Sequence, residues 1–220
     1  MTIISLLLLA SLLPHLTFTA HVNVGIVNGT EAKPHSRPYM VSLQENEKHF
    51  CGGFLISDDF VLTAAHCLIE GEILTAVVGA HNLKNENEGS VRIRVKSYHK
   101  HPDYNNKTDL NDIMLLRLEK NLKNIKNVKI ISIPTQQGDI KADSVCSVAG
   151  WGRLWTIGSL SDRLMETKGD SGGPLVCGDT AVGVTSFGSW FGCNSPEKPN
   201  VYTKISPHLK WISKIIKNDK

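Results

Sequence analysis

The chain lacks a second apolar segment long enough to cross a bilayer. Its one uncharged apolar run lies at the N-terminus, from Ile3 to Leu13. A membrane-spanning helix needs about 20 such residues, so this run is typical of the hydrophobic part of a signal peptide. We therefore expect residues 1–20 to be a signal peptide, and the mature product to be secreted without a membrane anchor.

Metal-ligand spacing and strong charge are also missing. None of the five cysteines stands in a C-x-x-C pair with a matching pair of histidines, the pattern typical of zinc sites. In an oxidising compartment we expect disulfides instead, and the odd count leaves at least one thiol over. The net charge is only +3, so nucleic-acid binding has little support. The sequence has no repeats, low-complexity tracts or flexible linker.

What the chain does contain is a series of short β-branched and aliphatic runs, separated by Gly, Asn, Asp and Glu. One set lies between Tyr39 and Val95 and a second between Ser144 and Ile205, with the polar stretch Lys120–Lys129 between the sets. This spacing predicts many short strands in a barrel or sandwich. Near the C-terminus, apolar residues recur at i, i+3 and i+7 with lysines elsewhere, which predicts an amphipathic helix. These apolar residues are Leu209, Ile212 and Ile216.

Three motifs carry residues suited to nucleophilic catalysis: Thr-Ala-Ala-His66-Cys, Asp112 before an apolar run, and Gly169-Asp-Ser171-Gly-Gly-Pro. A serine hydroxyl is a weak nucleophile, so it needs an imidazole to take its proton and a buried carboxylate to orient that imidazole. The glycines let the backbone turn tightly, so that the N–H groups of Gly169 and Ser171 can converge on a developing oxyanion. Taken singly, each motif is more often structural than catalytic.

Together, and in this order, the three motifs resemble the signature of the chymotrypsin/trypsin family. The segment Pro-His-Ser-Arg-Pro-Tyr-Met at residues 34–40 is similar to the granule proteases of haematopoietic cells: granzymes, mast cell proteases and cathepsin G. The resemblance implies an all-β fold of two antiparallel β-barrels with a C-terminal helix. It also implies a serine endopeptidase that cuts protein or peptide substrates through an acyl-enzyme, with His66, Asp112 and Ser171 as its catalytic residues.

The same resemblance implies partners and a location. Serpins are the expected inhibitors, cytoplasmic secretory granules the expected store, and no metal or organic cofactor is expected because side chains and water suffice for the chemistry.

Activation is also implied by resemblance. Ile26-Val-Asn-Gly resembles the mature N-terminus of these enzymes, whose freed α-amino group pairs with the Asp before the nucleophile, here Asp170. We therefore expect residues 21–25 to be a propeptide, residues 26–220 to be the protease domain, and the precursor to be inactive. Gly25 is not basic, so we do not expect a trypsin-like activating enzyme.

Further roles follow by resemblance. Disulfides are implied between Cys51 and Cys67 and between Cys146 and Cys177, which leaves Cys193 alone. The substrate backbone is expected to lie along Ser186, Phe187 and Gly188. Two N-x-S/T sequons, at Asn106 and Asn28, are expected glycosylation sites, and Asn106 is the better placed because Asn28 is so near Ile26.

One region departs from the family. Only seventeen residues separate Trp151 from Gly169, whereas relatives carry about thirty more, or about five to six strand-lengths of chain. That stretch ordinarily supplies two strands and the specificity pocket. Counting back six positions from Ser171 to the usual pocket floor leads to Met165, which reads equally well as part of a strand. We therefore expect an incomplete second barrel, with little or no proteolytic activity, in a spliced or truncated product.

An alternative function is a non-catalytic secreted protein that binds heparin-like proteoglycan. Basic residues gather in three groups, although they are equally typical of solvated surfaces. The groups are Arg92, Arg94, Lys96 and Lys100; Arg117, Lys120, Lys123, Lys126 and Lys129; and Lys210, Lys214, Lys217 and Lys220.

Overall fold

The computed structural model describes residues 29–68, 70–138, 140–141, 143–153, 159–166, 170–187 and 200–219. Several expectations fall outside these residues. They concern the signal peptide, the propeptide, Ile26, Asn28, Gly169, Gly188 and Cys193.

Six strands of the N-terminal half form a closed antiparallel barrel in the order β2-β3-β4-β7-β6-β5. The strands are β2 (Met40–Glu45), β3 (Lys48–Leu55), β4 (Phe60–Thr63), β5 (Thr75–Val78), β6 (Val91–Lys100) and β7 (Met114–Leu118). Strand β6 shows why these residues form a barrel wall, because Ile93 and Val95 are buried while Arg92, Arg94 and Lys96 are exposed. Such alternation turns one face of a strand to the core and the other to water.

The second sheet is antiparallel too, but among the described residues it does not close. Its order is β1-β9-β8-β10-β11-β12. The strands are β1 (Thr30–Glu31), β9 (Met165–Glu166), β8 (Cys146–Gly150), β10 (Pro174–Cys177), β11 (Thr180–Phe187) and β12 (Val201–Lys204). The expected all-β fold, with a complete first barrel and an incomplete second one, is therefore confirmed. The polar stretch at 120–129 joins the two halves and contains no strand.

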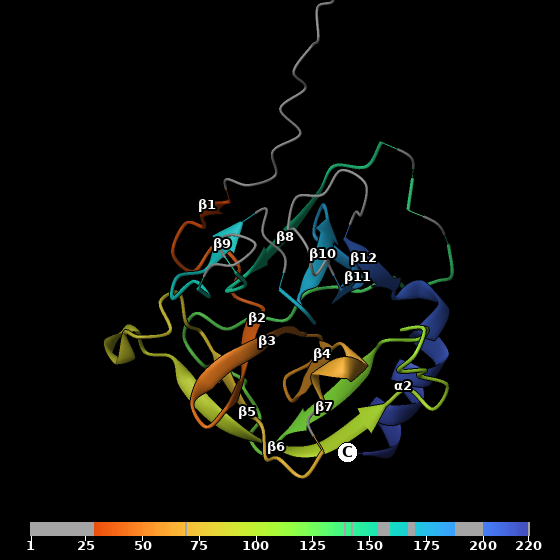
Figure 1. Ribbon diagram of the computed structural model, residues 1–220, viewed down its shortest axis with the longest axis horizontal. Helices are drawn as coiled ribbons and strands as arrows, with labels where there is room; N and C mark the ends of the chain where they lie inside the picture. The colour runs from red at the N-terminus through yellow and green to blue at the C-terminus, as the bar shows by residue number, and fades with distance from the viewer. Residues whose placement is uncertain are drawn as a thin grey trace, which may run out of the picture.

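The predicted C-terminal helix is α2 (Leu209–Asn218), which follows the 3-10 turn η4 (Ser206–His208). Figure 1 shows that it leaves β12 of the open sheet and runs down beside the barrel. Ile212 is 2% exposed, and Leu209 and Ile216 pack against the same core. Among the described helices, none has the length and apolar character needed to cross a membrane.

A second, smaller core joins the two halves near Trp151, whose side chain is fully buried. Its indole N–H donates to the His81 carbonyl at 3.1 Å. Met40 of β2 and Ala149 of β8 pack in the same cluster. The open sheet is thus fixed against the barrel although its own strands do not close.

Both expected disulfides are present. Cys51 of β3 is bonded to Cys67, and Cys146 of β8 to Cys177 of β10. The first bond ties the segment that carries His66 to the barrel, and the second joins two neighbouring strands of the open sheet.

Candidate active site

His66 and Asp112 meet at the upper end of the barrel. His66 lies in the 3-10 turn η2 (Ala65–Cys67) after β4, and Asp112 lies just before β7. His66 Nδ1 is 2.7 Å from Asp112 Oδ2, and the His66 backbone N–H donates to Oδ1 at 2.9 Å. The Asp112 side chain is fully buried, whereas 31% of the His66 side chain is exposed.

The Asp112 carboxyl is held in its charged form. Burial alone would raise its pKa, but hydrogen bonds from His66 and from the Ser186 hydroxyl outweigh burial, so the pKa lies below its ordinary value. Ser186 Oγ donates to Asp112 Oδ2 at 2.5 Å. A charged Asp112 accepts the Nδ1 proton, which leaves His66 Nε2 with its lone pair free to take a proton.

Ser171 lies on a tight turn that is packed against the barrel. Its carbonyl accepts the Gly52 N–H at 2.7 Å. The next residue, Gly172, has a φ of +81°, and a Cβ there would collide with Thr63 Oγ1 and the Gly52 carbonyl. Only glycine fits this turn, and at Gly172 the reason is its close approach to the barrel, which the sequence did not predict.

The Ser171 hydroxyl and the His66 ring are not hydrogen-bonded to each other in the described part of the chain. The nearest polar neighbour recorded for His66 Nε2 is Cys67 Sγ, at 3.7 Å. Catalytic hydrogen bonds often tighten only once substrate is bound. Two of the three predicted catalytic side chains are therefore joined, and the third lies on a neighbouring loop.

Asp170 has an unexpected neighbour. His49 Nε2 of strand β3 is 2.6 Å from Asp170 Oδ2, and both side chains are 5% exposed. Neither of these two atoms makes a hydrogen bond, so the contact is a short electrostatic one. Gly150 permits it, because a Cβ on Gly150 would collide with the Asp170 side chain. The predicted pairing of Asp170 with Ile26 concerns a residue outside the described ranges, and it stays a prediction.

His49 has a second polar contact, on its other ring nitrogen. Ser42 Oγ lies 2.8 Å from His49 Nδ1 and accepts a hydrogen bond from Gln44 Nε2 at 3.0 Å. Sequence reasoning missed His49. Its one signal is its position in the sequence, two residues before Cys51.

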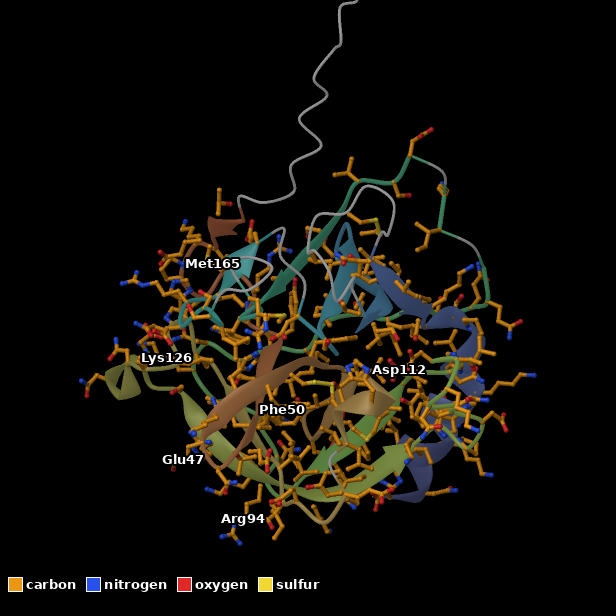
Figure 2. All side chains as sticks on the ribbon, in the orientation of Figure 1. Glu47, Phe50, Arg94, Asp112, Lys126 and Met165 are labelled. Atoms are coloured by element: carbon orange, nitrogen blue, oxygen red, sulfur yellow. A yellow bond between two sulfur atoms is a disulfide. The ribbon has the colours of Figure 1, made fainter. Side chains whose placement is uncertain are left out.

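The remaining predicted site residues are only partly described. Ser186 is 1% exposed and lies near the end of β11, and Phe187 is the last residue of that strand. Met165 pairs with Gly150 of β8 and with Glu31 of β1, so it belongs to a strand and not to a pocket floor. In Figure 2, Met165 lies toward the upper left of the molecule, apart from Asp112, which lies nearer the middle.

One group of potential metal ligands occurs among the described residues: Cys51, His66 and Cys67. Both sulfur atoms are consumed by the Cys51–Cys67 disulfide. Only one nitrogen remains, which does not make a metal site.

The comparisons with known proteins agree with this geometry. The trypsin family model matches residues 26–168 and 165–212. The chain belongs to the trypsin family. The match is in two pieces that meet at 165–168, at the point where the sequence is short. This trypsin-family chain is 38% identical to granzyme B(G,H) of Mus musculus, over 88% of this chain and 92% of the relative.

Other relatives point to the same group. Mast cell protease 3 of Ovis aries is 37% identical over 89% of this chain and 90% of its own length. Cathepsin G of Homo sapiens is 35% identical over 94% and 92%. The solved structure of neuropsin, a serine protease of mouse brain, matches with a TM-score of 0.76 and 31% identity over 86% of this chain and 99% of that one. The chain is therefore a trypsin-like serine protease of the granzyme and cathepsin G group.

The alignment with granzyme B(G,H) is 232 positions long, although it uses only 88% of the 220 residues of this chain. It therefore contains positions for which this chain has no residue, as the short segment after Trp151 predicts.

Proposed function

We propose that this chain descends from serine endopeptidases that cut peptide bonds through an acyl-enzyme, and that this shortened form has little or no such activity. The proposed roles are Ser171 as nucleophile, His66 as general base and Asp112 as the residue that orients His66. The observation that carries the first part is the buried, charged Asp112 bonded to His66 Nδ1 at 2.7 Å. The oxyanion-hole role of Gly169 and Ser171 is part of the same proposal.

The second part rests on the open sheet. Strand β9 has only two residues, and β12 is the last strand of a sheet that does not close. Substrate positioning contributes much of the rate enhancement of an enzyme, so a protease whose specificity pocket lacks a wall is expected to lose turnover even with its polar residues intact.

A covalent probe tests both parts. The chain is expressed, Ile26 is freed as the N-terminus, and the product is titrated with a serine-directed fluorophosphonate, with Ser171→Ala as the control for labelling elsewhere. We expect far less than one label per molecule. Stoichiometric labelling of Ser171 would show that the shortened form is a competent enzyme and would overturn the inactivity.

An insertion variant separates a lost pocket from a defective catalytic centre. The segment that granzyme B(G,H) carries at this point is inserted between Thr167 and Lys168, and labelling is repeated. If the insertion variant is labelled at Ser171, the result supports descent from an endopeptidase that has lost its specificity pocket. A folded insertion variant that stays unlabelled would contradict the assigned roles of His66, Asp112 and Ser171.

Maturation is proposed as follows. Residues 1–20 are removed on secretion, residues 21–25 are removed on activation, and the freed Ile26 amino group displaces His49 from Asp170. The short contact between Asp170 and His49 supports an inactive precursor, since that carboxylate is already occupied. Asn106 is the proposed glycosylation site because it is exposed on the loop before Asp112. Storage in secretory granules and serpin inhibition are proposed by analogy with the group.

Proteoglycan binding is the second candidate, and one groove favours it. The groove has a volume of about 560 Å³ and lies along α2, where Lys210, Lys214 and Lys217 line it together with Thr135 and Ser213. Its described lining contains no carboxylate, so it would attract a sulfated chain. Of the other basic residues, Arg94 and Lys126 lie away from α2 (Figure 2), whereas Arg117 contacts Asp219 at the C-terminal end of the helix.

Heparin-agarose tests this candidate. Binding at the groove predicts elution well above physiological salt. This retention should be lost in the triple variant Lys210→Ser, Lys214→Ser, Lys217→Ser. It should be kept in the control variant Arg92→Ser, Arg94→Ser. Elution at or below physiological salt would reject it, because weak retention is expected of any basic surface.

A further inference from the structure

Helix α2 bridges the two halves of the molecule. It follows β12 and η4 of the open sheet and buries Ile212 in a core that also contains Leu116 of the barrel strand β7. Ser171 belongs to the sheet side and His66 to the barrel side. The attachment of α2 therefore bears on how the two sides of the candidate active site are held together.

The C-terminal end of α2 is held by charge. Asp219 Oδ2 accepts the Ser97 hydroxyl at 2.7 Å and lies 2.8 Å from His99 Nε2. Its other oxygen accepts from Arg117 at 3.0 Å. The Ser97 hydrogen bond, with those from His99 and Arg117, lowers the pKa of Asp219 from 3.8 to about 2 although burial opposes it. The carboxylate is thus charged throughout the mildly acidic and neutral range.

The N-terminal end is held by neutral rings. His208, which precedes the first residue of α2 and is 9% exposed, lies edge-on to His101, with ring centres 4.7 Å apart. The ring centre of Trp211 is 5.0 Å from that of His101. Burial lowers the pKa of His101 and of His208. The charge of a protonated His101 lowers the pKa of His208 further.

Other charged groups lie near both ends of α2. Around His101 these are Asp103, whose backbone N–H donates to Nδ1 at 3.2 Å and whose charge favours protonation, and Lys100, which lies over the Tyr104 ring. At the other end, Arg117 also lies 3.8 Å from Asp59. Asp103 is the only carboxylate recorded among the described residues as acting on His101, and burial outweighs it.

We propose that α2 is a pH-sensitive strap with two unlike ends: proton uptake by His101 and His208 releases its N-terminal end, while Asp219 keeps the C-terminal end attached. Acidification then loosens the junction between η4 and the barrel without freeing the whole helix.

The direction of the pH effect follows from the difference in histidine pKa between the closed and the open form. A histidine whose pKa is lowered in the closed form binds its proton more readily in the open form, so opening becomes easier as the pH falls below the ordinary histidine value. Asp219 does not titrate in this pH range, since its pKa is lowered to about 2 and its carboxylate stays charged until the pH approaches that value.

Hydrogen exchange of the full chain tests the strap. Protection of α2 amides is measured at about pH 7.5 and about pH 5.5, the range in which histidine titrates, and is corrected for intrinsic exchange. We expect protection at the start of α2 to fall by up to about tenfold per pH unit for each proton taken up on opening. Amides of β4 and β7 serve as the internal reference and should not change.

Three variants assign the effect. His101→Phe and His208→Phe keep a flat ring but cannot take up a proton, so each should flatten the pH dependence; His101 is partly exposed and is the safer replacement if His208→Phe fails to fold. Asp219→Asn should lower protection at both pH values and keep the dependence. Equal corrected protection of wild-type α2 at both pH values, or an unchanged dependence in folded His101→Phe, would overturn the proposal.

Discussion

At the residue scale, His49 and Asp170 form a buried contact directly before Ser171 in the chain. Their side chains are each 5% exposed, so removing His49 takes away the one side chain that forms an ion pair with this buried carboxylate among the described residues. We expect His49→Phe to lower the free energy of unfolding by about 1–3 kcal/mol, the usual cost of leaving a buried polar group without its partner. Urea unfolding at neutral pH measures the loss.

An exposed pair is the matched control. Lys84 and Asp162 are 2.7 Å apart, but their side chains are 75% and 48% exposed. Lys84→Ala should therefore change stability by about 0–1 kcal/mol. Equal losses in His49→Phe and Lys84→Ala would mean that Asp170 does not depend on His49.

Gly172 is a second residue whose effect depends on its surroundings. It has a positive φ and no room for a Cβ beside Thr63 and Gly52, whereas Gly178 has a φ of +60° and open space around it. Both alanine variants incur the left-handed backbone cost of about 1–2 kcal/mol. Gly172→Ala should lose a further 1–3 kcal/mol or so through overpacking. Thermal unfolding of the two variants compares them, and similar melting temperatures would contradict the close approach.

At the scale of the element, α2 is stabilised by its apolar face, because a ten-residue helix is marginal without tertiary contacts. Ile212 is 2% exposed in the main core. Ile212→Ala should lower the free energy of unfolding by about 2–5 kcal/mol. Lys214 is exposed on the same helix, and Lys214→Ala should stay within about 0.5 kcal/mol. Chemical denaturation monitored by circular dichroism measures both; a small loss in Ile212→Ala would show that α2 is only loosely docked.

At the scale of the whole molecule, the joining of barrel, sheet and helix makes stability depend on acid. The pKa values of Asp112 and Asp219 are lowered in the folded state. Each carboxylate contributes stability that is present above its unfolded pKa and is lost as the pH falls through the folded value. For Asp219 the loss should run from about pH 4 down to about pH 2.

Asp219→Asn removes that contribution. The variant should be less stable than wild type at neutral pH, and the gap between the two should narrow as the pH falls from about 4 to about 2. Unfolding followed across this range measures the gap. Asp103→Asn is the control, since Asp103 lies on an exposed loop, and its gap to wild type should not follow the same course.

Much of this protein is predictable from local sequence. The strand-rich pattern, the apolar spacing of Leu209, Ile212 and Ile216, and the shortened segment after Trp151 predict the barrel, the helix and the open sheet. The two disulfides, known only by resemblance, are present. His49 is missed because a lone histidine in a strand carries no local sign of its partner, and Asp170 lies far along the chain.

The sequence by itself determines the lineage and the identity of the candidate catalytic residues, because the motifs and their order along the chain can be read without the structure. Tertiary structure alone decides what those residues face. It joins His66 to Asp112, places Asp170 against His49, and brings Asp219 to His99 across 120 residues of chain. The physical reason is that burial and charge pairing depend on distance in space, and a pKa or a buried contact has no counterpart in the local pattern of residues.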